Sequence, residues 1–207
     1  MKDERAEAVI LAAGDYPTRA ELLDILHNSP RVICCDSAAE DFIRKSGRKP
    51  WRIVGDLDSL PREMQEELAE IIVHEDEQET NDLSKAVRYA LSQGVSKVVI
   101  LGATGRREDH TLGNISLLID FMHQGLNATM LTDYGTFIPC RDHYSTELPL
   151  NTQVSIFSFG ATGFKAEGLR YPLHDFSSWW QGTLNETVNS TVIIQANGDF
   201  LVFVNRA

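Results

Sequence analysis

Cysteines, basic residues and long apolar segments are scarce in this sequence, and each shortage excludes a class of protein. Three of the 207 residues are cysteines (Cys34, Cys35 and Cys140), an odd and small number that argues against a disulfide-stabilised secreted domain. No apolar run approaches the ~20 residues of a membrane-spanning helix. The run over residues 8–13 is also too short for a signal peptide. We therefore expect a cytoplasmic protein that does not bind membranes.

Basic residues are outnumbered, because 19 Lys and Arg stand against 30 Asp and Glu and give a formal net charge of -11. Nucleic-acid binding needs a surplus of cations that displaces phosphate counterions, so we expect no nucleic-acid partner. The acidic surplus has two interpretations: it keeps the protein soluble, or some carboxylates hold metal ions. The 43% hydrophobic content is that of a folded globular chain.

The first part of the chain, from residue 8 to about 132, alternates short apolar runs with helical patterns. The runs are rich in Val and Ile and alternate little, which is typical of strands buried on both faces of a parallel sheet. They cover residues 8–12, 31–35, 51–54, 71–73, 97–101 and 128–131. Thr18 and Glu21 match a capping box at the start of the first helix. We predict an α/β fold, with an open, mostly parallel sheet and flanking helices.

The second part shows the alternation of half-exposed strands. Residues 152–159 alternate apolar and polar side chains, and residues 191–204 read as a hairpin with a type I′ turn at Asn197 and Gly198. We predict an α/β domain over residues 1–140 and a small all-β sandwich domain over residues 141–207.

Acidic residues directly follow predicted strands, at the edge where open α/β sheets bind ligands. Asp56 and Asp58 lie two positions apart, so both carboxylates would project to one side of an extended segment. Two close carboxylates repel each other, and a divalent cation would remove that cost. The alternative is a solvated turn before a helix that Pro61 begins. Asp36 follows another strand, where it could also be a helix N-cap.

Cationic side chains accompany these carboxylates. Asp82 and Lys85 would be neighbours on a helix, although a surface ion pair at a helix start explains them equally. Residues 102–110 run from a strand through a Gly-containing loop into a helix, which exposes backbone N–H groups to anions; the turn at Gly14 could also approach a phosphate. Carboxylates with Mg²⁺, beside Lys85 and Arg107, make a site for phosphate transfer. The P-loop pattern is absent from the sequence.

These segments, in this order, resemble the thiamine pyrophosphokinase family. The family pattern consists of D-G-G-A, G-D-x-D-S, D-Q-D-x-T-D-x-x-K, and G-G-R-x-D-H with an Asn four residues later. It is matched here by residues 36–39, 55–59, 77–85, 105–110 and Asn114. Ser37 and Ala38 stand where the family has two glycines. Asn81 replaces a threonine, and Arg106 replaces a glycine.

The resemblance implies an α/β catalytic domain and a β-sandwich domain that contributes to the thiamine site and to the interface of a homodimer. It implies that ATP and thiamine give thiamine diphosphate and AMP, with Mg²⁺ as cofactor. The thiamine hydroxyl attacks the β-phosphorus in this reaction, so that the pyrophosphoryl group moves in one piece.

The resemblance also implies roles for individual residues. The Mg²⁺ ligands are expected to be Asp56, Asp58 and Asp82. Lys85, Arg107 and Asp109 would position and neutralise the triphosphate, and the hydroxyl proton would pass to Asp56, Asp82 or Asp109. The nucleotide is expected to contact Gly14, Asp36, Ser59, Gln78, Gly105, His110 and Asn114.

The thiamine site is expected to involve the second domain. Tyr171 takes the place of a family aromatic residue, and Leu184 and Asn185 take the place of a Ser-Asn pair. Trp179 and Trp180 either line the same pocket or belong to the core of the β domain.

Two other functions fit the same motifs. A D-x-D segment after a strand also suits magnesium-dependent transferases that use nucleotide sugars, and these release a nucleoside diphosphate in place of AMP. A non-catalytic sensor would bind ATP or thiamine without turnover, but the retained charged residues of the motifs argue against it.

Overall fold

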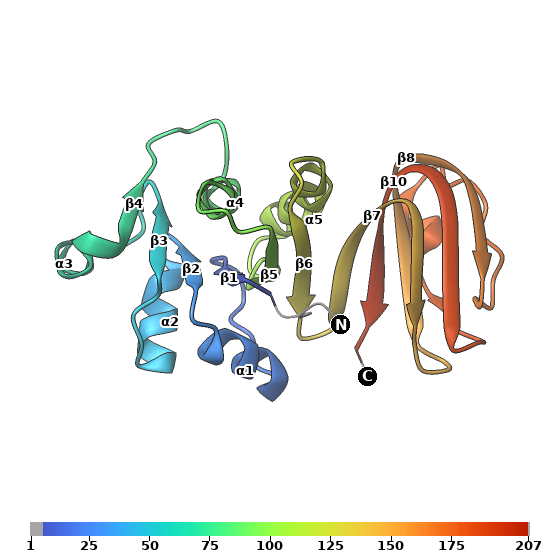
Figure 1. Ribbon diagram of the computed structural model, residues 1–207, viewed down its shortest axis with the longest axis horizontal. Coiled ribbons are helices and arrows are strands. Elements are labelled where there is room, and N and C mark those ends of the chain that lie inside the picture. The colour runs from blue at the N-terminus through green and yellow to red at the C-terminus, as the bar shows by residue number, and fades with distance from the viewer. Residues whose placement is uncertain (1–5, 207) are drawn as a thin grey trace.

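The computed structural model describes residues 6–206 and consists of an α/β part followed by an antiparallel β region (Figure 1). The α/β part contains β1 (Ala8–Leu11), α1 (Ala20–Asn28), β2 (Val32–Cys35), α2 (Ala38–Ser46), β3 (Arg52–Gly55), α3 (Arg62–Glu67), β4 (Ile72–His74), α4 (Asp82–Ser92), β5 (Lys97–Leu101), α5 (Glu108–His123) and β6 (Asn127–Thr132). The β region contains β7 (Gly135–Glu147), β8 (Gln153–Glu167), β9 (Asn185–Glu186) and β10 (Thr191–Asn205). Short 3₁₀ helices span Ala69–Ile71 and Trp179–Gly182.

The strands follow the order β4-β3-β2-β1-β5-β6-β7-β10-β8-β9. All pairings from β4 to β6 are parallel, and all pairings from β6 onward are antiparallel. The strand order reverses at β1, whose Val9 pairs with Val32 of β2 on one side and Val99 of β5 on the other. This confirms the predicted fold class and places the switch point of the sheet at the carboxyl ends of β1, β2 and β5.

Both faces of the parallel strands are buried, which explains why their sequences do not alternate. On one face, Ile10 and Val54 pack with Leu83 of α4, and α5 completes this cluster. On the other face, Val9 packs with residues of α1 and α2 that include Phe42. Figure 1 shows α4 and α5 in the upper part of the view and α1 and α2 in the lower part. Each large side chain buried in this way contributes about 1.5–3 kcal/mol of stability.

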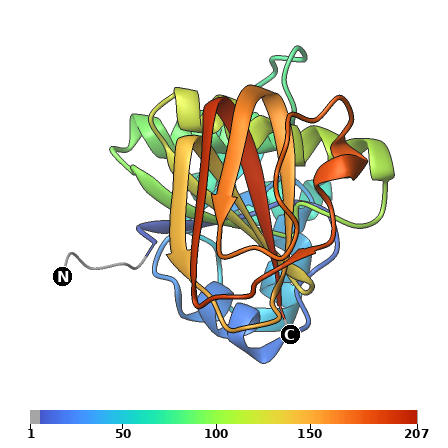
Figure 2. The same cartoon turned by 90° about the vertical axis from the view of Figure 1, so that its right-hand side faces the viewer.

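The β region has its own core. Its long strands β7, β8 and β10 share a cluster of buried residues that includes Val154, Ile156 and Val202. In Figure 1, β10 rises at the right, curves over the top and descends beside β7, so the strands form two layers. Figure 2 looks onto these strands, which lie in front of the α/β part.

Strand β7 joins the two parts, because it pairs with β6 on one side and with β10 on the other. The predicted division at residues 140 and 141 stays a prediction. Residues 1–5 and 207, which the predicted domains include, lie outside the described residues. No helix of residues 6–206 is long and apolar enough to cross a membrane.

The predicted hairpin turn at Asn197 and Gly198 is wrong. β10 runs without interruption from Thr191 to Asn205, and its register to β7 shifts between Gln195 and Asp199. Gly198 has φ 115°, and its N–H donates a hydrogen bond to Asp142 Oδ1 at 2.7 Å. An Asn-Gly pair serves a β-bulge as well as a type I′ turn, because both need a residue at positive φ.

The predicted capping box of the first helix is also wrong. The Thr18 hydroxyl donates to Asp133 Oδ2 at 2.7 Å, and Arg19 is the N-cap of α1, without a side-chain capping bond. Asp133 also accepts the backbone N–H of Thr18 at 3.0 Å. The Thr18 hydroxyl therefore binds Asp133, 115 residues away, and not the backbone of the helix that follows it.

Candidate active site

A cleft of about 420 Å³ lies at the carboxyl ends of β1, β2, β3 and β5, next to the switch point of the sheet. We call it the active-site cleft. It brings together most of the residues that the sequence singled out, namely Gly14, Asp36, Asp56, Ser59, Gln78, Asp82, Lys85, Gly105, Arg107, His110 and Asn114. Asp58 and Asp109 do not line it.

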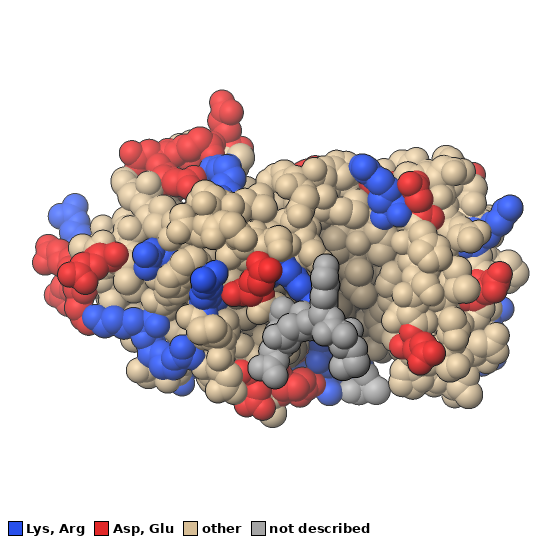
Figure 3. Space-filling view, in the orientation of Figure 1, with Lys and Arg blue, Asp and Glu red and all other residues tan. Residues whose placement is uncertain are grey.

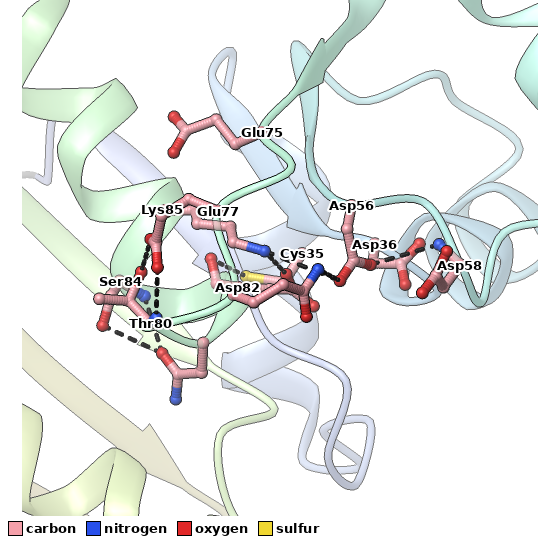
Figure 4. A network of polar contacts seen from close by, with 12 residues as sticks. Cys35, Asp36, Asp56, Asp58, Glu75, Glu77, Thr80, Asp82, Ser84 and Lys85 are labelled. Carbon is pink, nitrogen blue, oxygen red and sulfur yellow. Dashed lines mark hydrogen bonds and ion pairs between the residues drawn. The ribbon is translucent and has the colours of Figure 1, made fainter.

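Three carboxylates from three elements form the centre of the cleft (Figure 4). Asp36 follows β2, Asp56 follows β3, and Asp82 is the first residue of α4. One oxygen of each lies within 4.8 Å of the others. Gly55 permits this approach, since a Cβ there would lie 3.1 Å from Asp36 Cβ and 3.2 Å from Asp82 Oδ1. We call these three residues the carboxylate triad.

Asp36 is the member of the triad that has a buried oxygen free to bind a ligand. Its side chain is buried, with the residue 4% exposed, and its Oδ2 accepts the N–H of Ser59 at 3.2 Å. Its Oδ1 is buried without a hydrogen-bond partner. Burial raises the pKa of Asp36, and burial likewise raises the pKa of Asp82. Three hard carboxylate ligands with one unpaired buried oxygen fit a divalent cation such as Mg²⁺.

Lys85 places a buried positive charge beside the triad. It is 2% exposed, and its Nζ lies 3.3 Å from Asp82 Oδ1 and 3.8 Å from Asp56 Oδ2. The helical spacing of three residues brings Lys85 and Asp82 together, as the sequence indicated. Lys85 therefore offsets part of the negative charge of the triad, and a bound cation would offset more of it.

The start of α4 is held by its own N-cap residue and by a side chain of α5. Asn81 caps the helix by accepting the N–H of Ser84 at 3.0 Å, and its amide donates to Asn114 Oδ1 of α5 at 3.0 Å. Asn114 in turn donates to the carbonyl of Ala103 at 2.9 Å. The predicted nucleotide contact Asn114 therefore also links α4, α5 and the loop after β5.

The segment between β4 and α4 is strongly acidic, and Figure 3 shows Asp and Glu side chains gathered in the same part of the molecule. Arg88 ties this segment to α4 through bonds of 2.8 Å to Glu75 and 3.1 Å to Glu77. Gln78 reaches back to the triad and donates to Asp56 Oδ2 at 3.3 Å.

Arg107 and Asp109 pair with each other at the start of α5. The guanidinium of Arg107 binds both carboxylate oxygens of Asp109, at 3.1 and 2.6 Å. This pairing lowers the pKa of Asp109 to about 2. The backbone N–H of His110 also donates to Asp109, at 2.9 Å.

Asp58 is not a member of the triad, and the segment that carries it is not extended as the sequence reasoning assumed. Leu57 has φ 66°, and the N–H of Asp58 turns back to donate to Asp56 Oδ1 at 3.3 Å. This bond lowers the pKa of Asp56. The extended conformation assumed for this segment is wrong, while the role of Asp58 as a metal ligand stays a prediction.

Tyr171, Leu184 and Asn185 lie together in a small pocket of about 180 Å³ in the β region. The buried amide of Asn185 donates to the carbonyl of Tyr171 at 2.8 Å and accepts its N–H at 3.1 Å. Asn185 therefore positions Tyr171, which is 58% exposed. Trp179 packs on Phe157, whereas Trp180 is 74% exposed and is not part of the core.

Gly55 and Arg106 belong to the site although the sequence reasoning gave them no role. The close approach of Gly55 to Asp36 and Asp82 depends on residues far along the chain, so the local sequence around Gly55 carried no signal of it. Arg106 lines the cleft and has φ 58°; its signals in the sequence were its position in a glycine-containing loop and its replacement of a family glycine.

Comparisons with known proteins identify one family for both parts of the chain. Residues 22–130 match the family model described as thiamin pyrophosphokinase, catalytic domain, and residues 135–203 match the model described as its substrate-binding domain. Thiamin pyrophosphokinase 1 of Caenorhabditis elegans is 23% identical over 97% of this chain and 90% of its own length. Thiamine pyrophosphokinase of Bacillus subtilis is 35% identical over 35% of this chain and 36% of its own length.

Solved structures share the fold. Thiamine pyrophosphokinase from Bacillus subtilis superposes with a TM-score of 0.78 at 20% identity, covering 97% of this chain and 99% of that one. The yeast enzyme superposes with a TM-score of 0.80 at 16% identity, covering 99% and 87%. A parallel sheet that gathers three carboxylates and a buried lysine at its switch point defines a candidate metal-dependent, nucleotide-using transferase. The chain belongs to the thiamin pyrophosphokinase family.

Proposed function

We propose that this protein transfers the pyrophosphoryl group of ATP to thiamine and releases thiamine diphosphate and AMP. The carboxylate triad beside buried Lys85 carries this proposal, in a chain whose two parts match the catalytic and substrate-binding models of the family. The thiamine hydroxyl oxygen forms a bond to the β-phosphorus, the bond from that phosphorus to the α,β-bridging oxygen breaks, and AMP leaves with the electron pair.

The hydroxyl proton passes to a carboxylate, and Asp56, Asp82 and Asp109 are the candidates. Asp109 is the weakest base of the three, because its pair with Arg107 lowers its pKa to about 2. Lys85 lies where it can neutralise charge on the phosphates of ATP.

Mg²⁺ is the proposed metal, held by the carboxylate triad. When bound, it would supply positive charge to phosphate oxygens, which carry the charge of the transition state. The predicted ligands Asp56 and Asp82 belong to this group, and Asp36 is its third member.

The proposed reaction is tested by mixing purified protein with thiamine and Mg·ATP and separating the products by chromatography. Equal amounts of AMP and thiamine diphosphate are expected, and EDTA should abolish both. ADP as the nucleotide product would favour a different transferase. Binding of ATP or thiamine without any product would favour a sensor.

A homodimer is the proposed working form, with the β region of one copy completing the active site of the other. β3 and β9 lie near opposite ends of the strand order, so the triad and the pocket around Tyr171 are remote within one chain (Figure 1). The β region also exposes large apolar side chains, including Tyr171, Trp180 and Leu184, which is typical of an interaction surface.

Mixed dimers test the shared site. Asp56→Ala and Tyr171→Ala would each damage a different half of every site, so their mixture should regain activity that neither variant has alone. Random exchange of subunits predicts recovery of up to about a quarter of the wild-type rate. A mixture no more active than its components, although sedimentation shows exchanged dimers, would contradict a site shared between copies.

A further inference from the structure

Arg106 stands where two clefts meet. It lines the active-site cleft, and it also lines a neighbouring cleft of about 530 Å³ whose walls include Tyr16, Lys45 and Asp133. Within residues 6–206, Gly105 and Arg106 are the two residues that border both clefts. A ligand that extends from one cleft into the other must pass the Arg106 side chain.

The backbone at Arg106 adopts a conformation that arginine takes reluctantly. Its φ of 58° is in the left-handed region, which glycine enters freely and a residue with a Cβ enters at a cost. The preceding Gly105 packs closely on Asp15, since a Cβ at residue 105 would lie 2.0 Å from an Asp15 carboxylate oxygen. Strain retained in a substrate cleft is a reason to look for a function of the side chain.

The present partner of Arg106 holds it weakly. Its guanidinium lies 3.4 Å from Asp41 Oδ2 of α2, and the side chain is 54% exposed. Asp41 already has a second arginine partner, since Arg44 binds its other oxygen. Exposed ion pairs contribute little to stability, so Arg106 can leave Asp41 at small cost.

Arg107, the neighbouring cation of the same loop, is more firmly engaged. Two bonds, at 3.1 and 2.6 Å, join it to Asp109, whose pKa falls to about 2 as a result. Of the two guanidinium groups that border the active-site cleft in this loop, Arg106 therefore has the weaker competing contact.

ATP would need a cation at this position. A molecule whose phosphates lie near Lys85 must extend its nucleoside away from the carboxylate triad, and the second cleft opens directly beyond Arg106. The planar guanidinium offers paired N–H donors that match phosphate oxygens.

We propose that Arg106 binds the phosphate chain of ATP, exchanging its contact with Asp41 for charge-assisted hydrogen bonds to phosphate oxygens. This inference rests on the proposed function, because it takes ATP as the substrate. Arg106 is then a binding residue for the nucleotide and makes no contact with thiamine.

Four variants test the role of Arg106. Arg106→Gly removes the side chain and relieves the backbone, so the protein should fold and its melting temperature should not fall. Arg106→Lys keeps the positive charge but lacks the paired N–H donors of the guanidinium. Arg44→Gln is the matched control, because Arg44 shares Asp41 but lines neither cleft. Asp41→Asn frees Arg106 from its present partner.

The readouts are kcat, the KM for ATP and for thiamine, and the dissociation constant of Mg·ATP measured by calorimetry without thiamine. Arg106→Gly should raise the KM and dissociation constant for ATP about tenfold or more, as expected for lost charge-assisted bonds, while the KM for thiamine stays unchanged. Arg106→Lys should recover part of the loss, and Arg44→Gln should behave as wild type. Asp41→Asn should not weaken ATP binding.

Two results would overturn the role of Arg106. The first is an ATP affinity of Arg106→Gly within about twofold of wild type. The second is an equal loss in Asp41→Asn, which would show that Arg106 only ties its loop to α2. If the wild-type protein binds ATP without turnover, the proposed reaction is contradicted. The dissociation constants of Mg·ATP for the wild type and the variants would still decide the role of Arg106.

Discussion

At the scale of single residues, Asp36 lowers the stability of the ligand-free protein and at the same time provides an oxygen for a ligand. A buried carboxylate oxygen without a partner destabilises a protein by about 1–3 kcal/mol, and Asp36 Oδ1 is such an atom. Binding sites often retain side chains that reduce stability because the ligand needs them.

Asp36→Asn removes a negative charge that burial and the neighbouring carboxylates of Asp56 and Asp82 disfavour, so it should stabilise the metal-free protein and weaken its response to Mg²⁺. In EDTA we expect the melting temperature to rise by about 2–4 °C, as for a gain of about 1 kcal/mol in a chain of this size. The stabilisation that Mg²⁺ gives to the wild type should shrink in the variant. Thermal unfolding with EDTA and with Mg²⁺ measures both, and a variant that responds to Mg²⁺ as fully as wild type would remove Asp36 from the metal site.

Asp56 and Asp58 allow a second test at this scale, because they belong to one sequence motif but only Asp56 is part of the carboxylate triad. Asp56→Ala should reduce kcat at least ~10²-fold, like the loss of another group that stabilises the transition state. Asp58→Ala should reduce kcat much less if the triad alone holds the metal. Equal losses would return Asp58 to the ligand set that the sequence predicted.

At the scale of elements, helix α4 carries Asp82 and Lys85, and its first turn depends on Asn81. The Asn81 side chain caps the helix and joins it to Asn114. The N-cap bond to Ser84 and the hydrogen bond to Asn114 together fix the end of α4 that faces the cleft.

Asn81→Ala should lower the free energy of unfolding by about 1 kcal/mol, the usual loss for an N-cap. Asn81→Ser keeps a capping oxygen but cannot reach Asn114, so it separates the two contributions. Urea unfolding measures the stabilities and turnover reports the position of Lys85. An alanine variant as stable as wild type would contradict the capping role.

The parallel strands could be predicted from sequence, whereas several turns could not, and the difference lies in the range of the interactions. Ile10 and Val9 point to opposite buried faces, and this leaves a local signal in every central strand. The bond from Thr18 to Asp133 and the bulge at Gly198 depend on partners far along the chain. A local pattern cannot reveal such partners.

The sequence predicted which residues belong to the site better than it predicted how they are arranged. Motifs identified Asp36, Asp56, Asp82 and Lys85, and the ends of β2 and β3 and the first turn of α4 bring them together. The left-handed turn at Leu57 could not be anticipated, so Asp58 was placed beside Asp56 in an extended segment that does not exist.

At the scale of the whole molecule, Asp199 helps to hold the β region against the α/β part. Asp199 of β10 contacts Arg141 of β7 at 2.9 Å and His123 of α5 at 2.8 Å. The bond from Arg141 lowers the pKa of Asp199, and His123 adds to the effect. A carboxyl whose pKa is lower in the folded state stabilises the fold above its unfolded pKa, and this contribution disappears as pH falls through the folded value.

Asp199→Asn should therefore lower the melting temperature near pH 7, by at most about 2 °C because the pairs are partly exposed. The difference from wild type should begin to shrink as the pH falls below about 4, the unfolded value of an aspartate, and should vanish once the pH is below the lower folded pKa. Asp120→Asn, which removes an exposed charge on α5, serves as control. A difference that persists unchanged at pH 3 would contradict the electrostatic explanation.

The origin of the transferred phosphates tests the central claim most directly. Purified protein would be given thiamine, Mg²⁺ and ATP labelled at both the β and γ phosphates, and the label in each product would be counted. Transfer of an intact pyrophosphoryl group predicts thiamine diphosphate that carries both labels, together with unlabelled AMP. Thiamine monophosphate that carries only the γ label, together with labelled ADP, would contradict the proposed reaction.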